Sequence, residues 1–253
     1  VISEFLKLIC GKDAVKILDA YRETIAVIIP EITVMFNFNQ NNIHHSYDLW
    51  QHTLTALGTI EPNPILRMTM LLHDIGKPSV KTTDNSGQSH FQGHQLESKK
   101  IADKILHRLR LPSDFINKTL LLIEYHDVRF NGSKKLMKKV MNVLGTDLTK
   151  QLLEVEYADI SAQSEYQREE KLGYLKTAKT HLNEIIKDNE CFKLSQLDVN
   201  GKDVLNLGVK EGRDVGNILD YLLMLVVDAN VPNKKSILIS KAKEYIYGNQ
   251  INK

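Results

Sequence analysis

A buried helix that ends in a histidine and an aspartate constrains this chain more than any other feature. Residues 65–72 are apolar at six of eight positions, which is typical of a helix in a protein core. His73 and Asp74 follow directly. Gly76 and Pro78 predict the end of the helix, because glycine permits a positive φ and proline cannot continue a helix. Burying an imidazole beside a carboxylate is costly unless a partner satisfies both groups, and a metal ion is the simplest such partner.

Three further segments place histidine or aspartate on an otherwise apolar helix face. Helical spacing aligns His45, Leu49, His52 and Ala56; Phe115, Thr119, Leu122 and His126; and Leu148, Leu152, Val155, Asp159 and Ala162. A single histidine on such a face is usually a satisfied core residue, so neither histidine stripe is decisive alone. Asp159 is harder to dismiss, because buried carboxylates are rare unless they are paired or bound to metal. Several such residues in one chain indicate a shared polar site.

The order of these residues resembles the H…HD…D signature of the HD superfamily of metal-dependent phosphohydrolases. The signature falls on His52, His73, Asp74 and Asp159. His94 and His126 resemble the additional histidines of members that bind two metal ions. The resemblance implies a first ion held by the four signature residues and a second held by His94 and His126, with Asp74 bridging the two. These ligand types suit Mn, Fe, Ni, Co, Zn or Mg and do not discriminate among them.

The resemblance also implies an activity, the hydrolysis of nucleotide or RNA-terminal phosphoesters, with Asp74 and Lys77 as catalytic residues. A bound ion lowers the pKa of coordinated water toward neutrality and so supplies a nucleophile for phosphorus. Lys77 lies one helical turn after His73, where its ammonium can steady a phosphate or protonate a leaving group. The alternative for Lys77 is a cation favoured by the C-terminal dipole of the helix. A cyclic-dinucleotide phosphodiesterase of the HD-GYP type shares residues 73–77, but only one histidine stands at 126 and no Gly-Tyr-Pro follows.

Longer stretches narrow the resemblance to the HD and tail regions of bacterial tRNA nucleotidyltransferases and poly(A) polymerases. The stretches are Asn41-Asn42, His45, Tyr47-Asp48, Trp50, His52 to Leu54, Ser89 to His94, and Ala158 to Gln163. Asn200 to Asp203, with Gly208 and Gly216, resembles the C-terminal helical domain of the same proteins. Residues 209–212 read Val-Lys-Glu-Gly where the family usually has a proline-glycine turn.

The polymerase head of that family has no counterpart in the sequence. Its Gly-Gly turn, Arg-Asp pair and Asp-x-Asp metal pair are not found, so nucleotide addition is not assigned to these 253 residues. Because there is no initiator methionine at Val1, an excised domain, a trimmed chain and a headless paralogue all stay open. The competing interpretation is therefore a non-catalytic, tRNA-binding body of a CCA-adding enzyme or poly(A) polymerase.

Residues 128–146 contain no acidic residue and carry five cations: Arg129, Lys134, Lys135, Lys138 and Lys139. This segment begins just after His126, which favours a phosphate-binding or RNA-binding rim. The alternative is a solvated helix face whose buried side is formed by Leu136, Val140, Val143 and Leu144. The formal net charge of +2 does not decide between the two. We expect a nucleotide or tRNA-like RNA as the partner.

The helical periodicity predicts an all-α protein, an HD-domain helical bundle with a C-terminal helical subdomain. We expect three regions: an N-terminal neck-like segment at 1–30, the HD domain at 31–165 and a C-terminal helical domain at 166–253. Residues 80–91 predict a small hairpin or ordered loop. Gly145 predicts a break between a helix over 133–144 and another over 146–163.

Cysteine usage and hydropathy indicate a protein of a reducing compartment. Cys10 and Cys191 are far apart and lack the spacing of a metal site or a disulfide framework. No apolar run approaches the length of a membrane span, and no signal peptide is recognisable. We therefore expect a cytoplasmic protein that does not enter the membrane.

Overall fold

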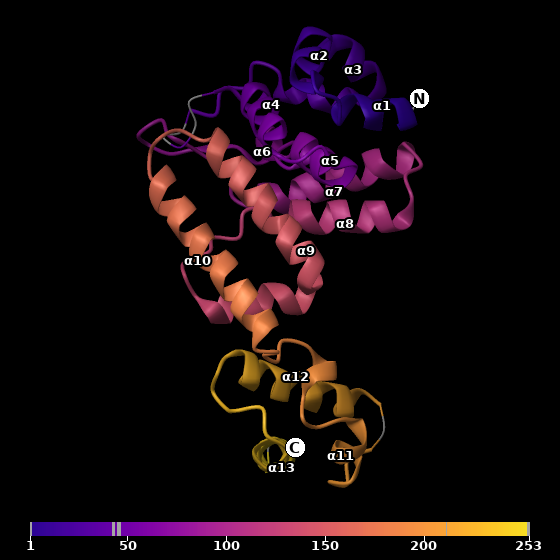
Figure 1. Ribbon diagram of the computed structural model, residues 1–253, viewed down its shortest axis with the longest axis vertical. Coiled ribbons are helices and arrows are strands. Elements are labelled where there is room, and N and C mark those ends of the chain that lie inside the picture. Colours follow the sequence, from indigo (N-terminus) through magenta and orange to yellow (C-terminus); the bar gives the residue numbers. More distant parts are fainter. Residues whose placement is uncertain (1, 42–43, 45–46, 211, 252–253) are drawn as a thin grey trace. The chain divides into compact units, whose positions relative to one another are not determined.

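The computed structural model describes all residues except 1, 42–43, 45–46, 211 and 252–253. Helices dominate the described residues, which confirms the predicted all-α fold (Figure 1). The α-helices are α1 (Ile2–Ile9), α2 (Ala14–Ala20), α3 (Arg22–Ile28), α4 (Leu49–Thr59), α5 (Pro64–Leu72), α6 (Lys77–Val80), α7 (His94–Arg108), α8 (Ser113–Tyr125), α9 (Lys134–Ala162), α10 (Arg168–Lys187), α11 (Gly201–Leu205), α12 (Arg213–Val227) and α13 (Lys235–Ile251). Three motif residues, Asn42, His45 and Glu211, lie outside the described part of the chain.

Short elements complete the described structure. The 3₁₀ helices η1 (Pro30–Met35) and η2 (Leu194–Gln196) follow α3 and α10, respectively. The strands β1 (Thr82–Thr83) and β2 (Ser89–His90) pair in an antiparallel hairpin, as predicted for this segment. Asp84 fixes the turn between them, because its side chain accepts hydrogen bonds from the backbone N–H groups of Ser86 and Gln88.

The chain forms two compact units. The first unit comprises residues 1–131 and 146–176, and the second unit comprises residues 132–145 and 177–253. The division expected from sequence, into a neck, an HD domain and a C-terminal domain, stays a prediction about functional regions.

The core of the first unit is built by packing of α4, α5, α7 and α8. The helix α7 lies along α8, and α5 packs against both α4 and α8 (Figure 1). Trp50, Leu54, Leu71 and Leu122 are almost completely buried between these helices. This packing brings several helix ends together, and those ends carry most of the predicted site residues.

Local capping fixes where the helices of the site begin. The helix α4 begins after Asp48, whose carboxylate accepts a 2.8 Å hydrogen bond from a backbone N–H in the first turn. The helix α5 begins after Asn63, which accepts two such bonds, and Pro64 takes the first helical position. These caps set the register that places His52 within α4 and His73 just after α5.

The turn after α5 needs its glycine for a different reason from the one predicted. Gly76 has a φ of −82°, so the expected positive φ is wrong. A Cβ at Gly76 would lie 2.5 Å from the backbone nitrogen of Ser98 and 2.8 Å from the carbonyl oxygen of His94. Pro78 lies near the start of α6, where a proline is tolerated, so it does not end a helix here. The glycine is required because α7 approaches this turn closely.

The predicted break at Gly145 is confirmed as a kink. Helical residues run on both sides of it within α9, but Gly145 itself has φ 70° and ψ 177°. This backbone conformation favours glycine, because a Cβ disfavours positive φ.

The second unit has its own hydrophobic core. Val204 of α11, Ile218 and Leu222 of α12, and Leu238 of α13 are buried together. Among the described residues of the whole chain, no helix is long and apolar enough to cross a membrane.

Candidate metal centre

All six predicted ligand residues lie in the first unit. They are His52 in α4, His73 and Asp74 in the turn after α5, His94 at the start of α7, His126 directly after α8, and Asp159 in the second half of α9. Five of them are buried, and the side chain of Asp159 is 15% exposed. Most of these residues lie at helix ends. Their side chains can therefore point into one common space although they belong to different helices.

Four of the six residues form the first group of potential ligands. His52 Nε2 lies 2.9 Å from Asp159 Oδ1 and 3.5 Å from Asp74 Oδ2. His73 Nε2 lies 3.2 Å from Asp74 Oδ2 and 3.5 Å from Asp159 Oδ1. One ligand atom from each residue lies within 4.8 Å of every other, so a single ion can reach all four.

The second group shares Asp74 with the first. Asp74 Oδ1 lies 3.3 Å from His94 Nε2 and 3.5 Å from His126 Nε2. The two histidine Nε2 atoms lie 3.1 Å apart. Asp74 therefore offers one oxygen to each group, which is the geometry of a bridging carboxylate.

The second ring nitrogen of each histidine orients the ring. The Nδ1 atoms of His73, His94 and His126 lie 2.7–2.9 Å from the backbone carbonyl oxygen three residues earlier. His52 Nδ1 lies 3.3 Å from the carbonyl oxygen of Ala162. We assign these contacts as Nδ1–H donors, since a carbonyl oxygen can only accept, and the Nε2 lone pairs then face the centre. Metal-binding histidines are commonly held in this way.

These donor atoms fit divalent ions. Within the described residues, Asp74 Oδ1 and His73 Nε2 have no hydrogen-bond partner although both are buried, and the close contact of Asp74 Oδ2 is with the ammonium of Lys77. The facing Nε2 atoms of His94 and His126 repel unless a proton or a cation lies between them. Imidazole nitrogen and carboxylate oxygen are common ligands of divalent ions, so the site suits one or two such ions.

Buried charges shift the pKa values of these groups strongly. Burial opposes ionisation of Asp74, but His73 and Lys77 outweigh it and hold its pKa well below its usual range. Burial also opposes a charged His73, yet Asp74 and Asp159 raise its pKa to about 10. The pKa of His94 is lowered, chiefly by burial and further by His126. A metal ion at Nε2 competes with a proton, so metal binding at this centre depends on pH.

Lys77 contacts the centre directly. Its side chain is almost fully buried, and its Nζ lies 2.6 Å from Asp74 Oδ2 and 3.1 Å from Gln40 Oε1. It also lies over the ring of Phe91, 5.6 Å from the centroid. These contacts place the ammonium of Lys77 inside the site, and its catalytic role stays a prediction.

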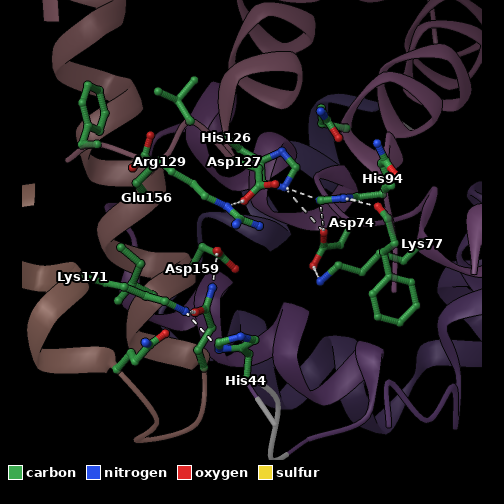
Figure 2. A pocket seen from close by; sticks show the side chains of 18 of the residues that line it. His44, Asp74, Lys77, His94, His126, Asp127, Arg129, Glu156, Asp159 and Lys171 are labelled. Carbon is green, nitrogen blue, oxygen red and sulfur yellow. Dashed lines mark hydrogen bonds and ion pairs between the residues drawn. The ribbon is translucent and has the colours of Figure 1, made fainter. Parts of the chain in front are cut away.

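The ligand groups line one side of a cavity of about 940 Å³. Figure 2 shows Asp74, His94, His126 and Lys77 on one side of it, and His44 and Lys171 on the other. The sequence analysis did not single out His44 or Lys171. His44 precedes α4 and Lys171 lies in the charged helix α10, and neither has a distinctive spacing signal.

Glu156 is a third cavity residue that the sequence did not reveal. It lines the cavity one helical turn before Asp159, is only 5% exposed, and its Oε1 has no hydrogen-bond partner within the described residues. Burial, and then the nearby carboxylates of Asp159 and Asp127, raise its pKa well above its usual range. The available signal was its position three residues before an aspartate on a buried helix face.

The predicted basic rim is divided between the two units. Arg129 lies in the first unit and lines the cavity, with its side chain 90% exposed. The four lysines lie in the second unit and contact carboxylates there. Lys134 and Lys138 pair with Glu190, Lys134 also pairs with Glu184 at 3.2 Å, and Lys135 and Lys139 pair with Asp228 at 3.1 and 3.0 Å. Val143, expected on the buried side of this helix, is 51% exposed, whereas Val140 and Leu144 are buried.

Comparison with known proteins connects the chain to tRNA enzymes. Residues 94–242 match the family model described as tRNA nucleotidyltransferase domain 2, putative. The chain is 29% identical over 221 residues to the CC-adding tRNA nucleotidyltransferase of Thermus thermophilus, covering 83% of this chain and 48% of that protein. It is 30% identical over 107 residues to the A-adding tRNA nucleotidyltransferase of Deinococcus radiodurans, covering 40% of this chain and 24% of that protein. The chain thus spans at most about half the length of these curated relatives.

Proposed function

This chain belongs to the family of the second domain of tRNA nucleotidyltransferases, and from that premise we propose that it is an RNA-binding helical body that receives an RNA end in the cavity of its first unit. The observation that carries the proposal is the family match over residues 94–242. That range includes α7 and α8, which carry His94 and precede His126 at the cavity, and most of the second unit. The names of the relatives describe enzymes that add nucleotides to tRNA, so tRNA is the RNA class that we propose as partner.

The cavity is also the proposed place of a divalent metal centre. His52, His73, Asp74 and Asp159 would hold one ion, and Asp74 would share a second with His94 and His126. The close donor atoms and the Nε2 lone pairs that face the centre support this assignment.

A second candidate function is phosphoester hydrolysis at the same centre, favoured by the complete set of buried ligand residues beside an open cavity. A bound divalent ion supplies a nucleophile by lowering the pKa of water, and it offsets charge on phosphoryl oxygens. The chain's own contribution would come from Lys77, whose ammonium can donate to a phosphoryl oxygen or to the leaving oxygen. Asp74 holds that ammonium in place.

The RNA-binding proposal is tested with a tRNA transcript and a DNA hairpin of equal length. Affinity is measured by fluorescence anisotropy over a series of salt concentrations, because phosphate contacts make log affinity fall linearly with log salt. We expect the transcript to bind at least about tenfold more tightly than the hairpin at each salt concentration. Equal affinities would contradict the proposal, because binding that depends on charge alone does not distinguish the two ligands.

The hydrolytic candidate is tested separately with bis(p-nitrophenyl) phosphate and a 3′-phosphorylated oligoribonucleotide. Each is incubated with the chain and one of Mn²⁺, Ni²⁺, Co²⁺, Zn²⁺ or Mg²⁺. Turnover that Asp74→Ala abolishes supports hydrolysis at the centre. Tight tRNA binding without turnover in any of these ions would exclude hydrolysis and leave the RNA-binding body.

A further inference from the structure

One part of the cavity, beside the ligand residue Asp159, brings together basic side chains from three segments of the chain. It is formed by His44, which precedes α4, Arg129, which follows α8, and Lys171 of α10 (Figure 2). These residues are far apart in the sequence, and the fold of the first unit brings them to one surface. His44 Nδ1 and Lys171 Nζ lie 3.5 Å apart.

The charges on this side oppose one another. Burial lowers the pKa of His44, and Lys171 and Arg129 lower it further. Burial also lowers the pKa of Lys171, where the repulsion of Arg129 acts against the attraction of Asp159. Cations gathered in this way disfavour one another until an anion lies between them, so this side of the cavity is suited to an anionic ligand.

The carboxylates near Arg129 and Lys171 do not neutralise these two cations by close contact. The nearest ion pair of Arg129 is with Asp127, and its N···O distance of 3.9 Å is at the limit of an ion pair. Within the described residues, no carboxylate lies within 4 Å of Lys171 Nζ, whose hydrogen bond is to the neutral Gln163 Oε1 at 2.6 Å.

Gln163 links Lys171 to the metal-ligand set. Its Oε1 accepts from Lys171, and its Nε2 donates to Asp159 Oδ2 at 2.8 Å. The ammonium is therefore held at a fixed place beside the centre. An anion bound by Lys171 would lie next to, but apart from, a phosphate at the ligand groups.

The mixed charge of this side discriminates between kinds of phosphate. Asp127 and Glu170 also line it, so it carries little net charge. A phosphodiester with one negative charge suits such a surface better than a terminal phosphate or a pyrophosphate with two or more. Of the phosphates in RNA, the one that joins two nucleotides has this single charge.

We infer that Arg129 and Lys171, with His44 beside them, bind the phosphodiester next to an RNA end whose terminal phosphate lies at the candidate metal centre. This inference rests on the proposed RNA-binding function and specifies its substrate class. The cavity would accept the end of an oligoribonucleotide and bind a mononucleotide weakly.

The test compares 3′-phosphorylated uridine mononucleotide with 3′-phosphorylated uridine trinucleotide. Binding to the metal-loaded full chain is measured by isothermal titration calorimetry, and the ligands recovered from the cell are checked for hydrolysis. We expect the trinucleotide to bind at least about tenfold more tightly, as one or two charge-assisted phosphate contacts imply. In Arg129→Gln/Lys171→Gln the preference should fall to about twofold, and the salt slope of trinucleotide binding should fall by about 1.4, which is about 0.7 for each lost contact.

Two further variants make the comparison specific. Lys104→Gln removes one positive charge from an exposed position on α7 that does not line the cavity, and it should keep the full preference. Arg129→Glu changes a side chain that is 90% exposed, so this variant should keep the fold. It therefore tests the inference even if the loss of Lys171 in the double variant disturbs Gln163. It should by itself lower trinucleotide affinity about fivefold and leave mononucleotide affinity within about twofold.

The inference is overturned if wild type binds both ligands equally, or if Arg129→Glu and the double variant both keep the preference. These outcomes differ from failure of the proposed function. A chain that binds tRNA more tightly than the DNA hairpin, but whose trinucleotide preference survives these substitutions, keeps the RNA-binding function and loses only the phosphodiester subsite.

Discussion

The two units use charged residues in different ways. In the first unit, histidines, aspartates and cations converge on one cavity, and within the described residues the buried atoms Asp74 Oδ1 and His73 Nε2 have no hydrogen-bond partner. In the second unit, the lysines of the basic segment contact Glu184, Glu190 and Asp228. The charged groups of the first unit can bind a ligand in the cavity, whereas the lysines of the second unit are already paired with carboxylates of the same unit.

The difference shows why a run of like charges in a sequence is weak evidence for a binding surface. Lys134 to Lys139 have no acidic neighbour along the chain, but Glu184 of α10, Glu190 after α10 and Asp228 directly after α12 supply acids in space. Such partly exposed pairs contribute about 0–1 kcal/mol each to stability. A phosphate would have to compete with these acids for each lysine.

The largest expected effect concerns Asp74, which contacts both ligand groups. An ion that binds only the folded state at 100 times its Kd stabilises wild type by about 2.7 kcal/mol, or about 5–10 °C in Tm for a chain of this size. Asp74→Ala should abolish this metal-induced shift, measured by calorimetry of EDTA-treated protein with and without added ion. The comparison uses the shift within each variant, because loss of Asp74 also lowers the starting Tm. An undiminished shift would place the ions elsewhere.

A smaller effect is expected for His126, which contacts only the second group. His126→Ala should remove one ion per chain where two bind and spare the ion held by His52, His73 and Asp159. The stoichiometry is measured by titration of the metal-free chain. His107→Ala serves as the control, because His107 is an exposed histidine of α7 that pairs with Asp103. Full stoichiometry in His126→Ala would show that the second group binds no ion.

Glu156 should make stability depend on pH. Its pKa is raised in the folded state, so its contribution is fully present below its unfolded pKa and is lost as pH rises toward the folded pKa. In EDTA, Glu156→Gln should therefore gain stability relative to wild type as pH rises above about 4.3, by up to about 1.4 kcal/mol per pH unit until the folded pKa is passed. Urea unfolding between pH 4 and 8 measures this difference. A constant difference across that range would mean that Glu156 ionises normally.

The smallest effect is expected in the second unit. Lys135→Gln/Lys139→Gln removes both contacts to Asp228, and we expect less than about 1 kcal/mol of lost stability per pair. Because these lysines are already paired, we expect tRNA affinity to change by less than about threefold, measured by the same anisotropy titration. A loss of tenfold or more would restore the basic segment as an RNA-binding rim and remove the contrast between the units.

Much of the fold, and the convergence of the six candidate ligand residues, could be predicted because local signals coincide with the family resemblance. The caps at Asp48 and Asn63, the kink at Gly145 and the hairpin at 80–91 all depend on residues close in sequence. Helical spacing singled out His52, His126 and Asp159, and the end of an apolar run singled out His73 and Asp74. Only the family resemblance pointed to His94.

Other features depend on contacts between distant segments. Gly76 is needed because a Cβ at this position would lie less than 3 Å from backbone atoms of α7, which no local pattern reveals. Lys171 lines the cavity and donates a hydrogen bond to Gln163. Lys135 pairs with Asp228, which is 93 residues away in the sequence. A side chain's partner in space decides whether it is free to bind, and a single sequence carries no direct signal for that partner.

Metal content of the purified chain tests the central claim most directly. The protein is prepared without chelator, dialysed against metal-free buffer and measured by inductively coupled plasma mass spectrometry beside Asp74→Ala. We expect about one or two divalent ions per wild-type chain and close to none in the variant, because Asp74 lies within reach of both ligand groups. A wild-type chain that retains no ion, and binds none when Mn²⁺, Fe²⁺, Ni²⁺, Co²⁺, Zn²⁺ or Mg²⁺ is added, would contradict the assignment.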